Sequence, residues 1–229
     1  EILEAAKDLL KEKGYTLEIK EFDDYPQQNV VVDEGEFDAN YFQHQPYLDN
    51  FNEEKGSDLV SAAKIHYEPL GIYPGASEDL ENIKDGAKMA VPNDATNEAR
   101  ALLLLEENGI ITLKEDAGLN ATKKDVEENP HNIEIVELDA AQIARVVEEL
   151  DFVILNGNYA LDAGFNVQTD AIAKEEADSE AAQTYANIIA VKKENKDSEK
   201  IKALVEVLQS EEIGKFITDT YEGAVVPMK

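Results

Sequence analysis

Four short segments of the chain gather side chains that could bind a small polar ligand. Asp38–Tyr47 combines three aromatic side chains with three amides, and Asn93–Arg100 opens a predicted helix with amide and guanidinium groups. Asn156–Tyr159 follows an apolar run, and Tyr185–Asn187 leads into another. Ligands of open α/β sheets bind beyond the carboxyl ends of strands, so these segments are the first candidates for a binding site.

The aromatic residues of Asp38–Tyr47 could stack around an apolar ligand group while the amides hydrogen-bond its polar rim. The whole chain holds nine Tyr, seven Phe and no Trp, so this segment concentrates them. An ordinary buried turn would have the same composition. The segment alone leaves both interpretations open.

Asn97 and Arg100 share a helix face with Asn93, in a segment that follows a predicted strand. A helix N-terminus presents unpaired N–H groups that suit a carboxylate. Arg100 and Arg145 are the only arginines in a chain that otherwise uses Lys, which favours a rigid bidentate fork at these positions. A surface ion pair with one of the fifty acidic residues is the alternative.

Asn156 ends an apolar strand, where its amide could offer a ligand both a donor and an acceptor. The dipeptide Asn156-Gly157 is equally typical of a tight turn. Asn187 lies at the start of another apolar strand and is a weak signal in isolation.

The sequence gives little support for a metal site, a phosphate-binding site or a catalytic nucleophile. His44, His66 and His131 lack zinc-ligand spacing, and no phosphate-binding loop or nucleophile elbow occurs. Without cysteine there is no disulfide, thiolate metal site or Cys nucleophile. We expect no catalytic residue, metal or cofactor.

The charge excludes two classes of partner. The 229 residues carry a formal charge of −29 with 43% apolar side chains, enough for a folded core. Nucleic acids and anionic bilayers require basic surfaces, which the chain lacks. We expect neither a signal peptide nor a membrane-spanning segment in this sequence, because its apolar runs are short.

Apolar periodicity predicts helices over 2–13, 24–34, 46–54, 77–86, 93–108 and 140–149, and two more around Ile201 and Ile213. It predicts strands over 15–19, 88–91, 133–138, 152–155 and 187–191, and a strand or strand end over 37–42. Residues 59–73 form a long, mostly extended stretch that Pro69 and Gly71 interrupt. Their alternation indicates an α/β fold with largely parallel sheets. Two long crossings suggest two lobes: residues 1–72 with 188–229 as lobe I, and residues 73–187 as lobe II.

Five segments carry a resemblance that runs from Glu1 to the C-terminus: DANYFQHQPYL, IHYEPLGIYP, VPNDATNEARALLLLEENGII, VELDAAQIARVVEELDFVILNGNYAL and YANIIAV. Together they resemble the methionine-binding lipoproteins of ABC importers, the NlpA/MetQ family. The resemblance implies a two-lobed periplasmic-binding-protein fold of type II, with a ligand cleft between lobes joined by two extended crossings.

The resemblance also implies a set of ligand-binding residues, which agrees with the chemistry of the four segments. A thioether favours aromatic edges, and a zwitterion needs an Arg fork and neutral acceptors. The implied set is Tyr41, Phe42, His44 and Tyr67 at the ligand side chain, Asn97 and Arg100 at its α-carboxylate, and Asn156 and Asn187 at its amino and carboxylate groups.

This sequence departs from the family pattern at its start. Family members begin with a signal peptide, a lipid-modified Cys and a first strand, none of which precedes the helix that opens here. The acidity is also greater than the family requires.

We therefore expect an extracytoplasmic solute-binding protein, lipid-anchored through an N-terminal Cys outside this sequence, that captures methionine and delivers it to an ABC permease. It would be a monomer without enzymatic activity. A methionine-containing dipeptide or another apolar amino acid is an alternative ligand. A small-metabolite enzyme on the same fold, with His44 as its base, and a surface adhesin are alternatives of other classes.

Overall fold

The computed structural model describes residues 1–176 and 179–228. The α-helices are α1 (Ile2–Glu12), α2 (Tyr25–Asp33), α3 (Gln45–Lys55), α4 (Ala95–Glu107), α5 (Ala140–Ile143), α6 (Gly157–Asp162), α7 (Glu180–Thr184), α8 (Glu199–Leu208) and α9 (Glu211–Tyr221). The 3-10 helices are η1 (Gly118–Asn120), η2 (Lys123–Asp125), η3 (Ala144–Glu149) and η4 (Lys193–Asn195).

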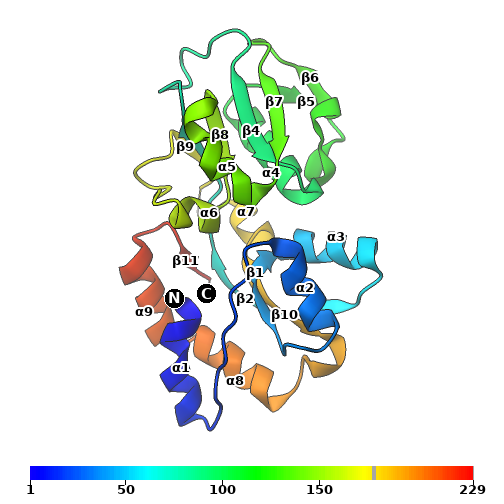
Figure 1. Ribbon diagram of the computed structural model, residues 1–229, viewed down its shortest axis with the longest axis vertical. Helices are drawn as coiled ribbons and strands as arrows, with labels where there is room; N and C mark the ends of the chain where they lie inside the picture. Colours follow the sequence, from blue (N-terminus) through cyan, green and yellow to red (C-terminus); the bar gives the residue numbers. More distant parts are fainter. Residues whose placement is uncertain (177–178, 229) are drawn as a thin grey trace. The chain divides into compact units, whose positions relative to one another are not determined.

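The strands are β1 (Asn40–His44), β2 (Leu59–Tyr67), β3 (Gly71–Pro74), β4 (Lys88–Pro92), β5 (Thr112–Leu113), β6 (Val126–Glu128), β7 (Glu134–Leu138), β8 (Phe152–Leu155), β9 (Ala173–Lys174), β10 (Asn187–Lys192) and β11 (Val226–Pro227). The order mixes strands and helices along the whole chain, as the α/β prediction requires (Figure 1).

The chain divides into two compact units. Unit 1 comprises residues 1–68 and 180–229, and unit 2 comprises residues 69–179. The sequence analysis placed the two boundaries between the lobes after residues 72 and 187, whereas the structure places them after residues 68 and 179. Strand β3, which begins at Gly71, pairs along its length with β8 and therefore belongs to unit 2.

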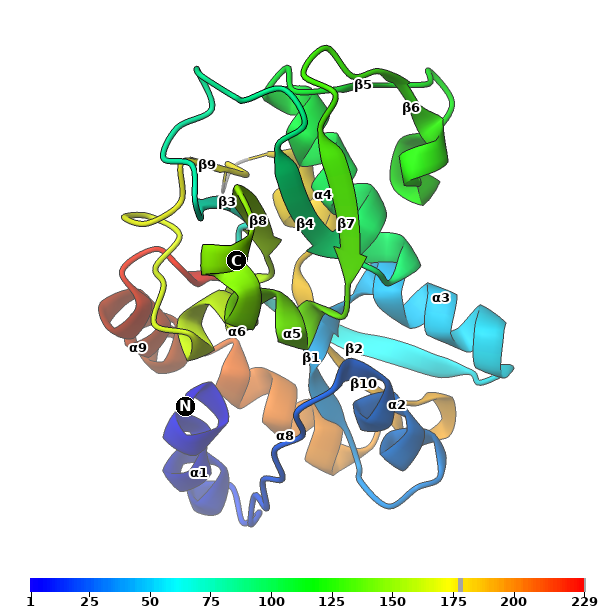
Figure 2. The same cartoon turned by 45° about the horizontal axis from the view of Figure 1, so that its top comes forward.

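Unit 1 is built on the sheet β1-β10-β2-β11. Every pair in it is antiparallel, so the expectation of largely parallel sheets is wrong for this unit. The reason is topological: β10 inserts between β1 and β2 and runs opposite to both. Helices α1, α8 and α9 cluster together at one side of this sheet, and α2 and α3 lie at the other (Figures 1 and 2).

Unit 2 is built on the sheet β7-β4-β8-β3-β9. Strands β7, β4 and β8 are parallel, as predicted, and β3 and β9 are antiparallel to their neighbours. Helix α4 packs on β4, where Met89 and Val91 join Leu102 and Leu105 in one fully buried cluster. This burial fixes α4 against the sheet and so positions the polar side chains of its first turns.

The first predicted element that the structure does not form is the helix over 77–86. Ser77, the first residue of the predicted range, has the chemistry of a helix cap, but its hydroxyl donates to Asp151 at 2.8 Å, and residues 77–87 form no helix. The predicted helix over 140–149 is not continuous: it changes to 3-10 geometry after Ile143, and Val146 within the 3-10 segment has a non-helical φ of −115°. Only Ala140–Ile143 is α-helical; Ala144–Glu149 is 3-10.

The predicted strand over 15–19 is also absent. Residues 15–22 have no assigned helix or strand and take part in no described strand pairing. A strand needs a partner for its backbone groups, and here the segment instead lines a groove of about 450 Å³ with Leu3, Ile189 and Leu204. No helix among residues 1–176 and 179–228 is long and apolar enough to cross a membrane.

Candidate ligand-binding site

The polar candidates of unit 2 stand where β4 gives way to α4. Strand β4 ends at Pro92, and Asp94 caps α4 by accepting the Asn97 backbone N–H at 3.0 Å. The Thr96 hydroxyl donates to the same carboxylate at 3.1 Å. Burial raises the pKa of Asp94, and the hydrogen bonds from Asn97 and Thr96 oppose that rise.

A directed chain of hydrogen bonds runs from Asp94 to Asn156. Because an ionised carboxylate only accepts, Asn97 turns its Nδ2 toward Asp94, at 3.0 and 3.1 Å from the two oxygens. The Oδ1 of Asn97 then accepts from Nδ2 of Asn156 at 2.9 Å. The Oδ1 of Asn156 is therefore the end of the chain, and it is a buried acceptor without a protein partner in the described residues.

An acceptor of this kind is a binding signal. Leaving a buried polar atom unpaired costs about 1–3 kcal/mol, so native structures rarely contain one without a reason. A ligand N–H group placed at Oδ1 of Asn156 would remove that cost. The tight-turn interpretation of Asn156-Gly157 does not account for this orientation of the side chain; Gly157 instead begins α6.

Arg100 lies one turn after Asn97 on α4 and is 4% exposed. Its Nε donates to Oε1 of Glu175 at 2.8 Å and its Nη2 donates to Oε2 at 2.6 Å. This is the bidentate fork that its isolation among lysines predicted, but the carboxylate belongs to the protein. The alternative of a surface ion pair is wrong for Arg100, because Glu175 is also buried.

The aromatic candidates of unit 1 form a cluster around β1 and α3. The ring of Phe42 lies 5.3 Å from that of Tyr25 and 5.9 Å from that of Tyr47. His44 accepts the Tyr47 backbone N–H at Nδ1 and packs edge-on against Tyr185, with ring centroids 5.1 Å apart. These contacts join the first and fourth sequence segments.

Two further candidates enter the same region of unit 1. Asn187 on β10 is the cross-strand partner of His44 on β1 and of His66 on β2. Tyr67 is fully buried and packs with Tyr185 and Ala182 in a small apolar cluster. Asn187 and Tyr67 are thus both close neighbours of the His44–Tyr185 contact.

Tyr41 points into a separate polar chain. Its hydroxyl hydrogen-bonds Nδ1 of His66, whose Nε2 lies 2.7 Å from Oε1 of Glu68. Since a carboxylate only accepts, the Nε2 proton faces Glu68 and Nδ1 faces the Tyr41 hydroxyl. Burial raises the pKa of Tyr41 well above its usual range, with the charge of Glu68 adding to the rise, so the phenol stays a donor.

The sequence interpretation missed four residues of these arrangements: Tyr25, His66, Glu68 and Glu175. Tyr25 is the first residue of α2, after the Asp24 cap, and nothing in the sequence around it predicts its ring contact with Phe42. Glu175 had a sequence signal only through its partner: a lone buried Arg requires a carboxylate. Nothing in the spacing distinguishes Glu175 from the other acidic residues.

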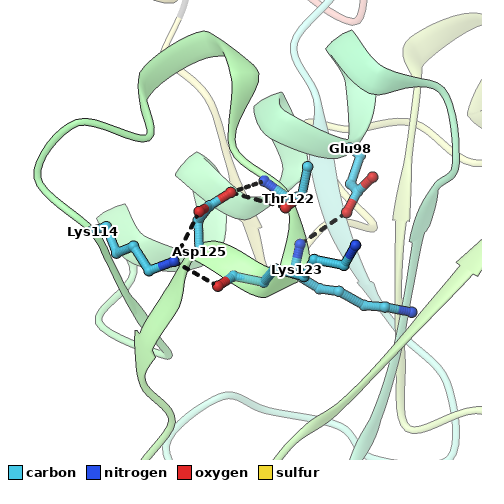
Figure 3. A network of polar contacts seen from close by, with 6 residues as sticks. Glu98, Lys114, Thr122, Lys123 and Asp125 are labelled. Carbon is cyan, nitrogen blue, oxygen red and sulfur yellow. Dashed lines mark hydrogen bonds and ion pairs between the residues drawn. The ribbon is translucent and has the colours of Figure 1, made fainter.

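Glu98 on α4 has a structural task instead. It accepts the Lys123 backbone N–H at 3.0 Å, and next to it Thr122 and Asp125 form a capping box that Lys114 also contacts (Figure 3). Burial raises the pKa of Glu98. The network fastens η2 to α4 and leaves Glu98 outside the Asn97–Asn156 chain.

Comparison with known proteins gives close relatives over the whole chain. The methionine-binding lipoprotein MetQ of Bacillus subtilis is 44% identical over 232 residues, which cover 100% of this chain and 84% of MetQ. A solved protein from Ruminococcus gnavus is 64% identical with a TM-score of 0.99, covering 100% of this chain and 94% of its own.

A nutrient-binding protein from Burkholderia cenocepacia, solved bound to methionine, is 43% identical with a TM-score of 0.95. The match covers 100% of this chain and 95% of that protein. The fold is thus that of the periplasmic substrate-binding proteins, as the resemblance implied. The model of the NlpA lipoprotein family matches residues 1–229, and this chain belongs to that family.

Proposed function

We propose that this protein captures free methionine outside the cytoplasm and delivers it to the permease of an ABC importer. The observation that carries the proposal is the buried, unpartnered Oδ1 of Asn156, held as an acceptor by Asn97 and Asp94. An α-ammonium group is a strong donor for such an atom. The similarity to a relative solved with methionine supports the same ligand.

The polar end of methionine is assigned to unit 2 and to Asn187. Asn97 and Arg100 bind the α-carboxylate, while Asn156 and Asn187 bind the amino and carboxylate groups. Glu175 holds two N–H groups of the Arg100 fork in place. A guanidinium has five N–H donors, and a bidentate pair with one carboxylate uses two of them.

The thioether end is assigned to the aromatic cluster of unit 1. Tyr41, Phe42, His44 and Tyr67 line the side-chain pocket, because a polarizable sulfur gains from contact with ring edges. Tyr25 and Tyr47 hold Phe42 in place through their ring contacts. Units 1 and 2 act as the two lobes of the binding protein, with the crossings near Glu68 and Ser179 as hinges.

The remaining assignments are further parts of the same proposal, and family membership supports the extracytoplasmic, membrane-anchored location. The protein is held at the outer face of a membrane by a lipid on an N-terminal Cys outside this sequence, and it acts as a monomer. It catalyses no reaction, so methionine leaves the protein chemically unchanged.

Native mass spectrometry before and after denaturation tests for a co-purified amino acid, and calorimetry then measures methionine binding to ligand-free protein. At about 100 times Kd, methionine adds roughly 2.7 kcal/mol to the free energy of unfolding, a rise in Tm of about 5–10 °C. A rise with a methionine-containing dipeptide or another apolar amino acid, but not with methionine, would contradict the substrate. Conversion of methionine to a new mass would contradict the non-enzymatic role.

A further inference from the structure

Among the described contacts of unit 2, the side-chain carboxylate of Glu175 accepts three hydrogen bonds. Both its carboxylate oxygens accept from Arg100, at 2.8 and 2.6 Å, and Oε2 also accepts the Leu70 backbone N–H at 2.9 Å. Glu175 is 5% exposed and Arg100 is 4% exposed. The carboxylate thereby fixes the plane of the guanidinium relative to β3, which begins next to Leu70.

The pair also sets the charge of the site. A buried guanidinium beside a buried carboxylate has no net charge, and a second carboxylate brought to Arg100 would add an uncompensated negative charge in a region poor in water. Asp94, nearly two turns earlier on the same segment, is a further carboxylate and makes an added anion less favourable still. The Oδ1 of Asn156 is a neutral acceptor that cannot balance an anion.

A ligand can compensate its own carboxylate only if it carries a cation. The α-ammonium of an amino acid does this, and the acceptor on Asn156 is of the right polarity to receive it. An acid with the same thioether chain but no ammonium group cannot compensate the charge of its carboxylate. The charge balance at Arg100 therefore distinguishes zwitterions from anions of nearly the same shape.

We propose that Glu175 is a positioning and specificity-determining residue, which orients Arg100 and restricts the site to ligands that carry both a carboxylate and an ammonium group. The inference rests on the proposed function, because it takes the Arg100 region as the carboxylate site. It adds a charge filter that acts through Arg100 rather than through direct contact with the ligand.

Calorimetry of Glu175→Gln with methionine and with 4-(methylsulfanyl)butanoate tests this filter. The amide removes the negative charge and offers Arg100 only one acceptor oxygen. We expect methionine to bind at least about tenfold more weakly, and the ratio of the two dissociation constants to move at least about tenfold toward the anion. Glu175→Asp, which keeps the charge on a shorter side chain, should weaken both ligands by the same factor and keep the wild-type ratio.

Glu98→Gln is the matched control, because Glu98 is a buried carboxylate on α4 that bonds Lys123 instead of Arg100. In Glu98→Gln, the ratio of the dissociation constants for methionine and 4-(methylsulfanyl)butanoate should equal that of the wild type. A folded Glu175→Gln with the wild-type ratio would overturn the inference. If Glu175→Gln does not fold, Glu175→Asp decides: equal loss for both ligands supports the inference, and unchanged affinities or a changed ratio overturn it. Failure of wild-type protein to bind methionine would instead contradict the proposed function.

Discussion

Asn156 donates from Nδ2 to Oδ1 of Asn97 at 2.9 Å, across 59 positions of the sequence. This single bond links the end of β8 to the first turns of α4, and Asp94 determines its direction. If the side-chain amide of Asn97 were turned round, its Nδ2 would face Nδ2 of Asn156, and two donors would oppose each other. The acceptor at the end of the chain is therefore a consequence of the carboxylate at its beginning.

Asn156→Ala should weaken methionine binding by about 1.5–3 kcal/mol, or roughly 10- to 150-fold, because a hydrogen bond to a charged ammonium is lost. Calorimetry measures the change. Asn82→Ala is the control: Asn82 is exposed, bonds only to nearby Asp79 in the described contacts, and should bind methionine like the wild type. Equal affinities for the two variants would mean that Asn156 is a structural residue.

The sequence was most informative about elements whose partners are local. The helices predicted over 2–13, 24–34 and 46–54 correspond to α1, α2 and α3, because capping and end signals such as Asp24 and Gly56 act within one or two turns. Elements that depend on distant partners were not. Ser77 has the chemistry of a helix cap, but Asp151, 74 positions later, takes its hydroxyl.

The same distinction applies to the site. The four segments and the resemblance predicted Asn97, Arg100 and Asn156, and the structure brings the amides of Asn97 and Asn156 into contact. The fork on Arg100 followed from its residue type, whereas Glu175 did not, because one carboxylate among fifty acids has no distinguishing spacing. Pairing over 75 positions is a property of the fold.

The second prediction concerns the aromatic cluster of unit 1. Phe42→Ala should weaken methionine binding by about 2–4 kcal/mol, because the ring that Tyr25 and Tyr47 support is lost. Phe22→Ala is the matched control; its ring contacts Phe37 beside the groove of unit 1 instead. Calorimetry on both folded variants decides. Wild-type affinity in Phe42→Ala would make the segment a structural turn.

The third prediction concerns stability and pH. Asp151 accepts the Lys88 backbone N–H at 2.9 Å and the Ser77 hydroxyl at 2.8 Å, and these bonds lower its pKa, the Lys88 bond most. A lowered pKa in the folded state means that the contribution to stability is present above the ordinary Asp value of about 3.9 and is lost as pH falls through the folded value.

Asp151→Asn should therefore lower Tm at neutral pH by about 2–4 °C, corresponding to roughly 1 kcal/mol after allowance for solvent screening. The difference from wild type should shrink as pH falls through and below the ordinary Asp range. Thermal melts at a series of pH values measure it. A constant difference at every pH would show that packing, and not the charge of Asp151, is responsible.

The last prediction separates a planar fork from a point charge at position 100. Lys cannot reproduce two parallel N–H bonds to Glu175 and still present a second donor pair to a ligand. Arg100→Lys should thus weaken methionine binding by about 2–5 kcal/mol, although the charge is preserved. Arg145→Lys, at the exposed second arginine, should bind like the wild type.

These two substitutions cover every guanidinium in the chain, so calorimetry of the pair is a complete comparison. An exposed ion pair is worth at most about 1 kcal/mol and survives the exchange of Arg for Lys, whereas a buried bidentate pair does not. Circular dichroism and Tm show whether Arg100→Lys is folded before its affinity is read. If both folded variants bind methionine equally well, Arg100 serves only Glu175, and the N–H groups at the start of α4 must bind the ligand carboxylate without it.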